Sequence, residues 1–222
     1  TIEDQKSTAV TLRNSADPAA AEEGDFTVTK ALAGDGDFSK STFEFTYTCT
    51  DGTEGSLTVT GAATSEKSKK VKAGSTCTIS ENSAKAGQDG YTLTAPAAQT
   101  VTIAKDQTAA VTMTNTYARD MGTFSVTKVV TGVESVDNEF AFSYTCDNNA
   151  KDTLKVKADG SVASGPELPV GTKCTIAEDA QSAQVKGYTL EAPASQEVTI
   201  SEKEKAVLVT FTNAYTPEPK PE

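Results

Sequence analysis

The 222-residue sequence predicts an all-β protein built from two tandem domains. Threonine and valine alternate through many short segments, as is typical of half-buried strands. The chain is longer than the usual domain of about 100 to 150 residues, which favours two domains. A segment of whole-domain length also occurs twice, which supports two domains.

The repeat has a period of about 97 residues, which is the size of a domain and not of a solenoid unit. Its landmarks return in the same order in both copies. The matching segments are 24–30 with 122–128, 43–49 with 140–146, 77–81 with 174–178, 90–93 with 187–190, and 111–117 with 209–215.

A third, partial copy opens the chain, because residues 2–14 have the spacing of residues 103–115. We therefore expect the terminal strands of a preceding repeat at the start of the chain, and a longer array in the native protein. The opposite phase, in which each module begins with this hairpin, stays open. The predicted parts are residues 1–15 from a preceding repeat, a linker at 16–23, module 1 at 24–117, a linker at 118–121, module 2 at 122–215, and a proline-rich spacer at 216–222.

Charge and composition disfavour several classes of partner. The net charge of −11 is spread along the chain and would repel nucleic acid and an anionic membrane surface. No apolar run is long enough to cross a membrane, and we expect any targeting signal to lie outside this sequence. We expect no nucleic acid, no membrane insertion of this fragment and no cofactor.

Four cysteines form two pairs with the same internal spacing, and neither pair has a Cys-x-x-Cys arrangement. This pattern predicts the disulfides Cys49–Cys77 and Cys146–Cys174 and an oxidising, extracellular setting. Four buried free thiols are the alternative, since free cysteine is also common in cores. A structural zinc site is disfavoured because the sequence has no histidine and the cysteines lack ligand spacing.

Three polar residues of each module share a strand face with apolar residues. Side chains two apart point to the same side of a strand. In the first strand a lysine follows phenylalanine and valine at alternate positions, in the middle strand a glutamate follows cysteine and isoleucine, and in the last strand an asparagine follows two apolar residues. We expect all of them to point inward: Lys30, Glu81 and Asn115 in module 1, and Lys128, Glu178 and Asn213 in module 2.

Burying an isolated amine or carboxylate costs several kcal/mol, so this constellation needs an explanation. Three remain open. Each group could lie at a strand end, where lysine reaches water and the others cap turns. The lysine and glutamate could form an ordinary buried ion pair. In the third, an intramolecular isopeptide bond forms when an uncharged lysine amine attacks the asparagine side-chain carbonyl and ammonia leaves.

The third chemistry needs these residue types. Burial favours a neutral lysine amine and a protonated carboxyl group, and folding holds amine and amide at high effective molarity. A protonated glutamate would polarise the asparagine carbonyl and carry protons. Glu81 and Glu178 are therefore the candidate catalytic residues of a single-turnover self-reaction, and we expect no enzyme activity on an outside substrate.

With these residues in place, the sequence resembles the Cna-B-like modules of Gram-positive adhesins and pilins, particularly a cysteine-bearing actinobacterial surface variety. The matching features are Val-Thr-Lys closing the first strand, residues 169–178 (PVGTKCTIAE) ahead of 187–190 (GYTL), and a terminal Thr-Asn-x-Tyr. The resemblance covers about residues 24–215. It implies immunoglobulin-like β-sandwiches with glutamate-assisted isopeptide bonds Lys30–Asn115 and Lys128–Asn213.

Two features depart from that family. Module 1 has residues 73–76 (AGST) where module 2 has residues 169–172 (PVGT). A disulfide is also not general in such modules, which leaves open whether the cysteine-bearing variety forms the isopeptide bond.

The resemblance implies stalk or spacer repeats of a Gram-positive cell-surface adhesin or pilus, extracellular and anchored to the cell wall by a part outside this chain. The expected partners are neighbouring repeats of the same chain, with the chain monomeric, while other parts of the protein bind a host protein or glycan. The alternative is a ligand-binding adhesin module that grips such a ligand through end loops, for example residues 61–70. The nearly equal length of the two copies and the absence of tryptophan favour a spacer.

Overall fold

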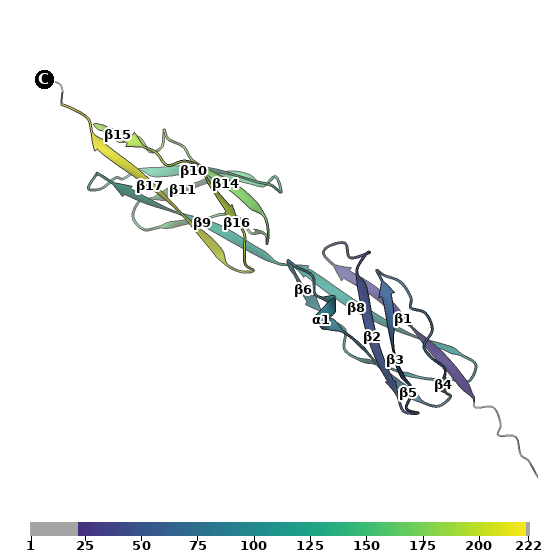
Figure 1. Ribbon diagram of the computed structural model, residues 1–222. Helices are drawn as coiled ribbons and strands as arrows, with labels where there is room; N and C mark the ends of the chain where they lie inside the picture. The colour runs from purple at the N-terminus through teal and green to yellow at the C-terminus, as the bar shows by residue number, and fades with distance from the viewer. Residues whose placement is uncertain (1–21, 221–222) are drawn as a thin grey trace, which may run out of the picture. The chain divides into compact units, whose positions relative to one another are not determined.

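A computed structural model describes residues 22–220 of the chain (Figure 1). It confirms the all-β prediction, with two tandem modules that each consist of two stacked sheets. The strands predicted for a preceding repeat at residues 1–15, most of the linker at 16–23 and the last two residues of the spacer lie outside the described residues.

Module 1 contains two four-stranded sheets. One has the order β4-β1-β8-β6 and the other the order β3-β2-β5-β7. Their bounds are β1 Glu23–Gly34, β2 Thr42–Cys49, β3 Glu54–Thr60, β4 Val71–Lys72, β5 Thr76–Glu81, β6 Tyr91–Thr94, β7 Gln99–Thr102 and β8 Thr108–Arg119, with the short helix α1 at Ser83–Ala86.

Module 2 repeats this plan. Its sheets have the orders β12-β9-β17-β15, with β13 also pairing β9, and β11-β10-β14-β16. The bounds are β9 Met121–Thr131, β10 Glu139–Cys146, β11 Lys151–Lys157, β12 Val162–Ser164, β13 Leu168–Pro169, β14 Lys173–Glu178, β15 Tyr188–Glu191, β16 Gln196–Thr199 and β17 Ala206–Pro217. Its first and last strands, β9 and β17, pair in parallel.

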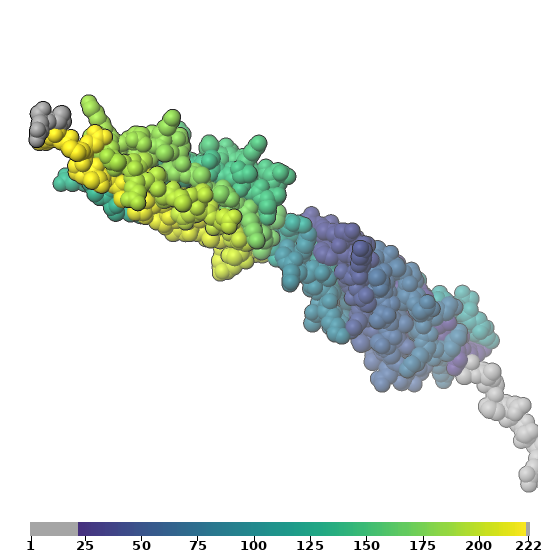
Figure 2. Space-filling model, turned by 45° about the horizontal axis from the view of Figure 1, so that its top comes forward, coloured from purple at the N-terminus to yellow at the C-terminus, as the bar shows by residue number. Residues whose placement is uncertain are grey.

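Alternation along the strands builds the core between the sheets. In β2 the residues Phe43, Phe45, Tyr47 and Cys49 are buried, and the residues between them are not. β17 alternates in the same way, and the space-filling view shows this yellow strand running along the surface of module 2 (Figure 2). Each sheet therefore presents one face to the core and the other to solvent.

A glycine directly follows β9 because the last strand passes very close to it. Gly132 has a φ of 77°, and a Cβ atom there would lie 1.9 Å from the carbonyl oxygen of Tyr215. Only glycine combines this backbone conformation with the space available. The contact holds the end of β9 against the part of β17 that carries the candidate site.

Strands occupy most of the region predicted as the linker 118–121. β8 runs through Arg119 and β9 begins at Met121, so only Asp120 lies outside a strand. The predicted spacer 216–222 also begins inside β17, where Thr216 pairs with Thr189 and Pro217 with Tyr188.

Candidate functional site

The candidate site of module 2 lies between its two sheets. Lys128 on β9 is the Cα partner of Phe211 on the parallel strand β17, and Asn213 lies two residues further along β17. Residues two apart share a face, so β17 turns Asn213 to the same side as Phe211, whose side chain is in the core. Glu178 comes from the other sheet, at the end of β14. Three segments distant in the sequence thus supply the three predicted residues.

Amine, amide and carboxylate meet at one oxygen atom in module 2. Lys128 Nζ lies 3.2 Å from Glu178 Oε1, and Asn213 Nδ2 donates a hydrogen bond of 3.3 Å to that same oxygen. Lys128 Nζ also donates to the carbonyl oxygen of Phe211 at 3.3 Å. The Lys128 and Glu178 side chains are 0% and 1% exposed, and Asn213 is 0% exposed, so the site is dry.

The contact with Glu178 differs from the expected one in a detail. We expected the glutamate both to polarise the asparagine carbonyl and to carry protons to the leaving nitrogen, and the group that faces it is the amide nitrogen. Asn213 Oδ1 and Glu178 Oε2 are buried and have no hydrogen-bond partner among the described residues. The arrangement suits proton transfer to the amide nitrogen better than polarisation of the oxygen.

Module 1 places its predicted residues in equivalent positions. Lys30 Nζ lies 3.0 Å from Glu81 Oε1, and the two side chains are 0% and 1% exposed. Asn115 is fully buried on β8, the strand that corresponds to β17. The lysines therefore do not reach water from their strand ends, which contradicts the first of the three explanations.

Both lysines are held in surroundings that disfavour positive charge. Loss of hydration by burial lowers the pKa of Lys30 and of Lys128, and the neighbouring glutamate only partly opposes this effect. Lys30 Nζ also lies 4.8 Å from the ring centre of Phe43, and Lys128 Nζ lies 5.0 Å from that of Phe140. An aromatic face attracts a cation, so these contacts, like the glutamates, offset only part of the lost hydration. Each site thus favours the neutral amine more than a solvated site would.

Each asparagine also contacts a buried tyrosine to which the sequence had given no role. Asn213 Nδ2 donates to the Tyr215 hydroxyl at 3.5 Å, and that hydroxyl donates to the carbonyl of Ala183 at 2.6 Å. The tyrosine of the Thr-Asn-x-Tyr motif lies two residues after the asparagine. Strand alternation could therefore have placed it inside.

The structure contains both predicted disulfides, Cys49–Cys77 and Cys146–Cys174. In each module the two cysteines are direct Cα partners on neighbouring antiparallel strands, β2 with β5 and β10 with β14. The bridges lie at the core, since no cysteine is more than 9% exposed.

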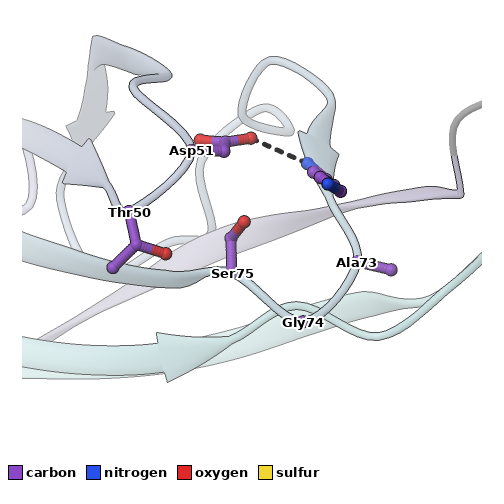
Figure 3. Close-up of a pocket in the computed structure, with 6 residues that line it drawn as sticks. Thr50, Asp51, Ala73, Gly74 and Ser75 are labelled. Atoms are coloured by element: carbon purple, nitrogen blue, oxygen red, sulfur yellow. Dashed lines mark hydrogen bonds between the residues drawn. The ribbon is translucent and has the colours of Figure 1, made fainter.

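A shallow surface depression beside the β4–β5 turn is formed by residues whose polar groups bind their own chain (Figure 3). The Asp51 carboxylate accepts hydrogen bonds from the backbone of Thr53 and Lys72, both at 2.9 Å. These bonds, that from Lys72 first, lower the pKa of Asp51. Thr50 Oγ1 accepts from the amide of Thr76 at 3.1 Å. The depression is a junction of turns in which the side chains of Asp51 and Thr50 bond the backbone.

The segment considered as a binding loop, residues 61–70, packs against β1. Ser65 and Ser68 are buried and hydrogen-bond to that strand. Within residues 22–220 no cluster of histidine, cysteine or carboxylate side chains could hold a metal ion. In the same part of the chain, no helix is long and apolar enough to span a bilayer.

Solved structures with a similar fold include the TIE protein of Bacillus anthracis, with 18% identity and a TM-score of 0.50. That match covers 86% of this chain and 34% of the other, so the chain spans about a third of that protein's length. A minor pilin of Streptococcus agalactiae, GBS52, has 13% identity and a TM-score of 0.36, with 88% of this chain and 98% of that chain covered. An adhesin of Mobiluncus mulieris containing intramolecular disulfide, isopeptide and ester bond cross-links has 16% identity and a TM-score of 0.35, with 80% and 86% covered.

No curated protein has a sequence that matches this chain. A family model does match, and it matches twice, at residues 26–118 and 124–216. The two matches coincide closely with the two sandwiches and cover most of the chain. The chain therefore belongs to the family described as a domain of unknown function, DUF5979, and carries two copies of that domain.

Proposed function

We propose that this chain is a stalk segment of an extracellular Gram-positive adhesin or pilus, in which the isopeptide bonds Lys30–Asn115 and Lys128–Asn213 lock the modules. One observation carries the proposal. In module 2 the nucleophilic amine and the amide it would attack both contact Glu178 Oε1 inside a site closed to water.

The reaction follows from these contacts. A bond forms between Lys128 Nζ and Cγ of Asn213, and the bond from Cγ to Nδ2 breaks. One proton of the neutral amine passes through Glu178 to Nδ2, which leaves as ammonia. Lowering the lysine pKa supplies the neutral nucleophile, and folding supplies proximity. The glutamate ends as it began, but the module is changed permanently, so each site reacts once.

The parallel pairing of β9 with β17 gives the bond a mechanical role. A chain pulled at both ends carries force into a module along its first strand and out along its last. A bond between Lys128 and Asn213 joins these strands directly, so tension passes across the link and bypasses the segment of roughly 85 residues between them. By analogy with disulfides, closing a loop of that length adds about 4 to 5 kcal/mol of stability.

We further propose that the anchor to the cell wall and any surface that binds a host protein or glycan belong to other parts of the protein. Neighbouring repeats are then the direct partners of these modules. A stalk requires mechanical strength but no ligand-binding cleft. The shallow depression beside the β4–β5 turn, where Asp51 bonds the backbone, agrees with this role.

Intact-mass spectrometry tests the proposal. After reduction of the disulfides, the full chain should weigh less than its sequence mass by two molecules of ammonia. Glu81→Ala and Glu178→Ala should each restore one ammonia, because proton transfer in the altered module is lost. A reduced chain of full sequence mass would leave the buried lysine–glutamate ion pair as the correct account.

A further inference from the structure

We propose that Tyr117 and Tyr215 are positioning residues for the cross-link, which fix the asparagine side-chain amide with its nitrogen toward the tyrosine hydroxyl. The inference rests on the proposed isopeptide function. It concerns a different question, namely what decides which way the reacting amide faces.

The hydrogen-bonding capacity of the tyrosine sets the direction. A phenol has one proton to donate. In module 2 the hydroxyl of Tyr215 gives that proton to the carbonyl oxygen of Ala183, at 2.6 Å. Towards Asn213 it can then act only as an acceptor. The amide nitrogen can donate to it and the amide oxygen cannot, so the partner selects one of the two orientations.

Burial keeps this arrangement in place. Tyr215 is 3% exposed, and loss of hydration raises its pKa, with the charge of Glu178 acting in the same direction and the Asn213 hydrogen bond opposing it. The phenol therefore retains its proton, and Ala183 retains its donor. Leaving the buried carbonyl of Ala183 without a donor is unfavourable, which keeps the hydroxyl in this role.

The selected orientation is the productive one. Asn213 Nδ2 lies between Glu178 Oε1 at 3.3 Å and the Tyr215 hydroxyl at 3.5 Å. The nitrogen that must leave is thus beside the group that relays its proton. A reversed amide would turn Oδ1 towards the Tyr215 hydroxyl, whose proton is already donated to Ala183, and Nδ2 away from Glu178. The contact to tyrosine is long, as such contacts often are before reaction.

Module 1 contains the same chain of contacts. Asn115 Nδ2 donates to the Tyr117 hydroxyl at 3.3 Å, and this hydroxyl donates to the carbonyl of Ala86 at 2.7 Å. The accepting carbonyl lies in each case in the segment after the glutamate-bearing strand. The arrangement thus recurs although the two segments differ in sequence.

The test compares Tyr215→Phe with wild type in the full chain, using intact mass to follow ammonia loss over time in module 2. Phenylalanine preserves the ring and removes the acceptor. We expect bond formation in module 2 to slow by about tenfold while module 1 reacts normally. Tyr117→Phe should produce the reverse pattern.

A second background separates positioning from support of the fold. In Asn213→Asp the carboxyl group has two equivalent oxygens, so it needs no orientation, and the bond forms with loss of water. Tyr215→Phe should slow the asparagine protein and leave the rate of the aspartate protein nearly unchanged. Equal slowing in both backgrounds, or no slowing in either, would overturn the positioning role. A wild-type chain that loses no ammonia would instead overturn the isopeptide function itself, and the inference with it.

Discussion

The two modules carry the same buried site but support their first strand differently. In module 2 the strand β12 pairs with β9 through the backbone, with Val162, Ala163 and Ser164 opposite residues 125–127. In module 1 the corresponding segment forms no strand: it contacts β1 through an isolated bridge between Thr64 and Thr29 and through a few single backbone hydrogen bonds. The backbone hydrogen-bonding groups along the edge of the first strand can therefore be paired in more than one way while the buried site stays the same.

Two serines replace the missing strand in module 1. Ser65 forms two hydrogen bonds with one residue of β1: its amide donates to the Val28 carbonyl, and its hydroxyl accepts from the Val28 amide at 3.0 Å. Ser68 forms the same two hydrogen bonds with Phe26, and its hydroxyl accepts from the Phe26 amide at 3.1 Å. Each serine thus satisfies the backbone of one β1 residue as a paired strand would, with its hydroxyl in place of the backbone carbonyl that would accept from the β1 amide.

A charged network adds a second difference. Asp25 of module 1 is 3% exposed and receives hydrogen bonds from Thr108 and Lys70, with Lys67 Nζ at 3.6 Å. Module 2 has Thr123 at the equivalent position, and its hydroxyl bonds backbone carbonyls. The inward-facing residues are thus the same in both modules, whereas the outer contacts that support the first strand differ.

The largest expected effect should be equal in the two modules. Lys30→Met and Lys128→Met each leave a buried glutamate without its cation, which costs about 3 to 5 kcal/mol, and each also removes the proposed cross-link. Calorimetry of the full chain should show a comparable fall in the unfolding temperature of the altered module. Adding Glu178→Gln to Lys128→Met should recover part of the loss, because no charge then remains buried. A large loss in one module only would show that the two sites are not equivalent.

A smaller effect should be confined to module 1. Ser65→Ala or Ser68→Ala removes an acceptor from a buried amide of β1, so each should destabilise module 1 by about 1 to 3 kcal/mol. The control in module 2 is Val162→Ala on β12, which lies opposite Thr127 as Thr64 lies opposite Thr29 and is 52% exposed. We expect that change to stay within about 0.5 kcal/mol. Similar losses from Ser65→Ala and Val162→Ala in denaturant titrations would break the comparison.

The smallest effect is a difference in acid sensitivity. Hydrogen bonds from Thr108 and then Lys70 lower the pKa of Asp25 in the folded protein below its ordinary value of 3.8. Its contribution to stability is therefore complete above that value and is lost as the pH falls from there through the lowered pKa. We expect the effect to be small because the lysines of the network are largely exposed.

Urea unfolding of each module between neutral and strongly acid pH measures this difference. Module 1 should lose an increment of stability at acid pH that Asp25→Asn abolishes, while Thr123→Ala should leave the pH profile of module 2 unchanged. A module 1 profile that is the same with and without Asp25→Asn would refute the role of the network.

Features that depend on strand period and on the repeat could be predicted from the amino-acid sequence. Alternation along a strand has a period of two, so the positions of Lys30, Lys128, Asn115 and Asn213 relative to apolar neighbours were enough to predict that these side chains are buried. The identical spacing of the cysteine pairs likewise indicated which cysteines join. Both conclusions need only local geometry or a comparison of two copies.

How the three groups of each site meet became visible only with the folded arrangement of the two sheets. Glu178 reaches Lys128 from the opposite sheet, and the amide of Asn213 turns its nitrogen, not its oxygen, to that glutamate. The Tyr215 hydroxyl donates its proton to the carbonyl of Ala183. The serines that complete β1 could not be foreseen for the same reason. Distances between sheets and the direction of a hydrogen bond depend on how segments far apart in the chain pack together, and strand periodicity contains no information about that packing.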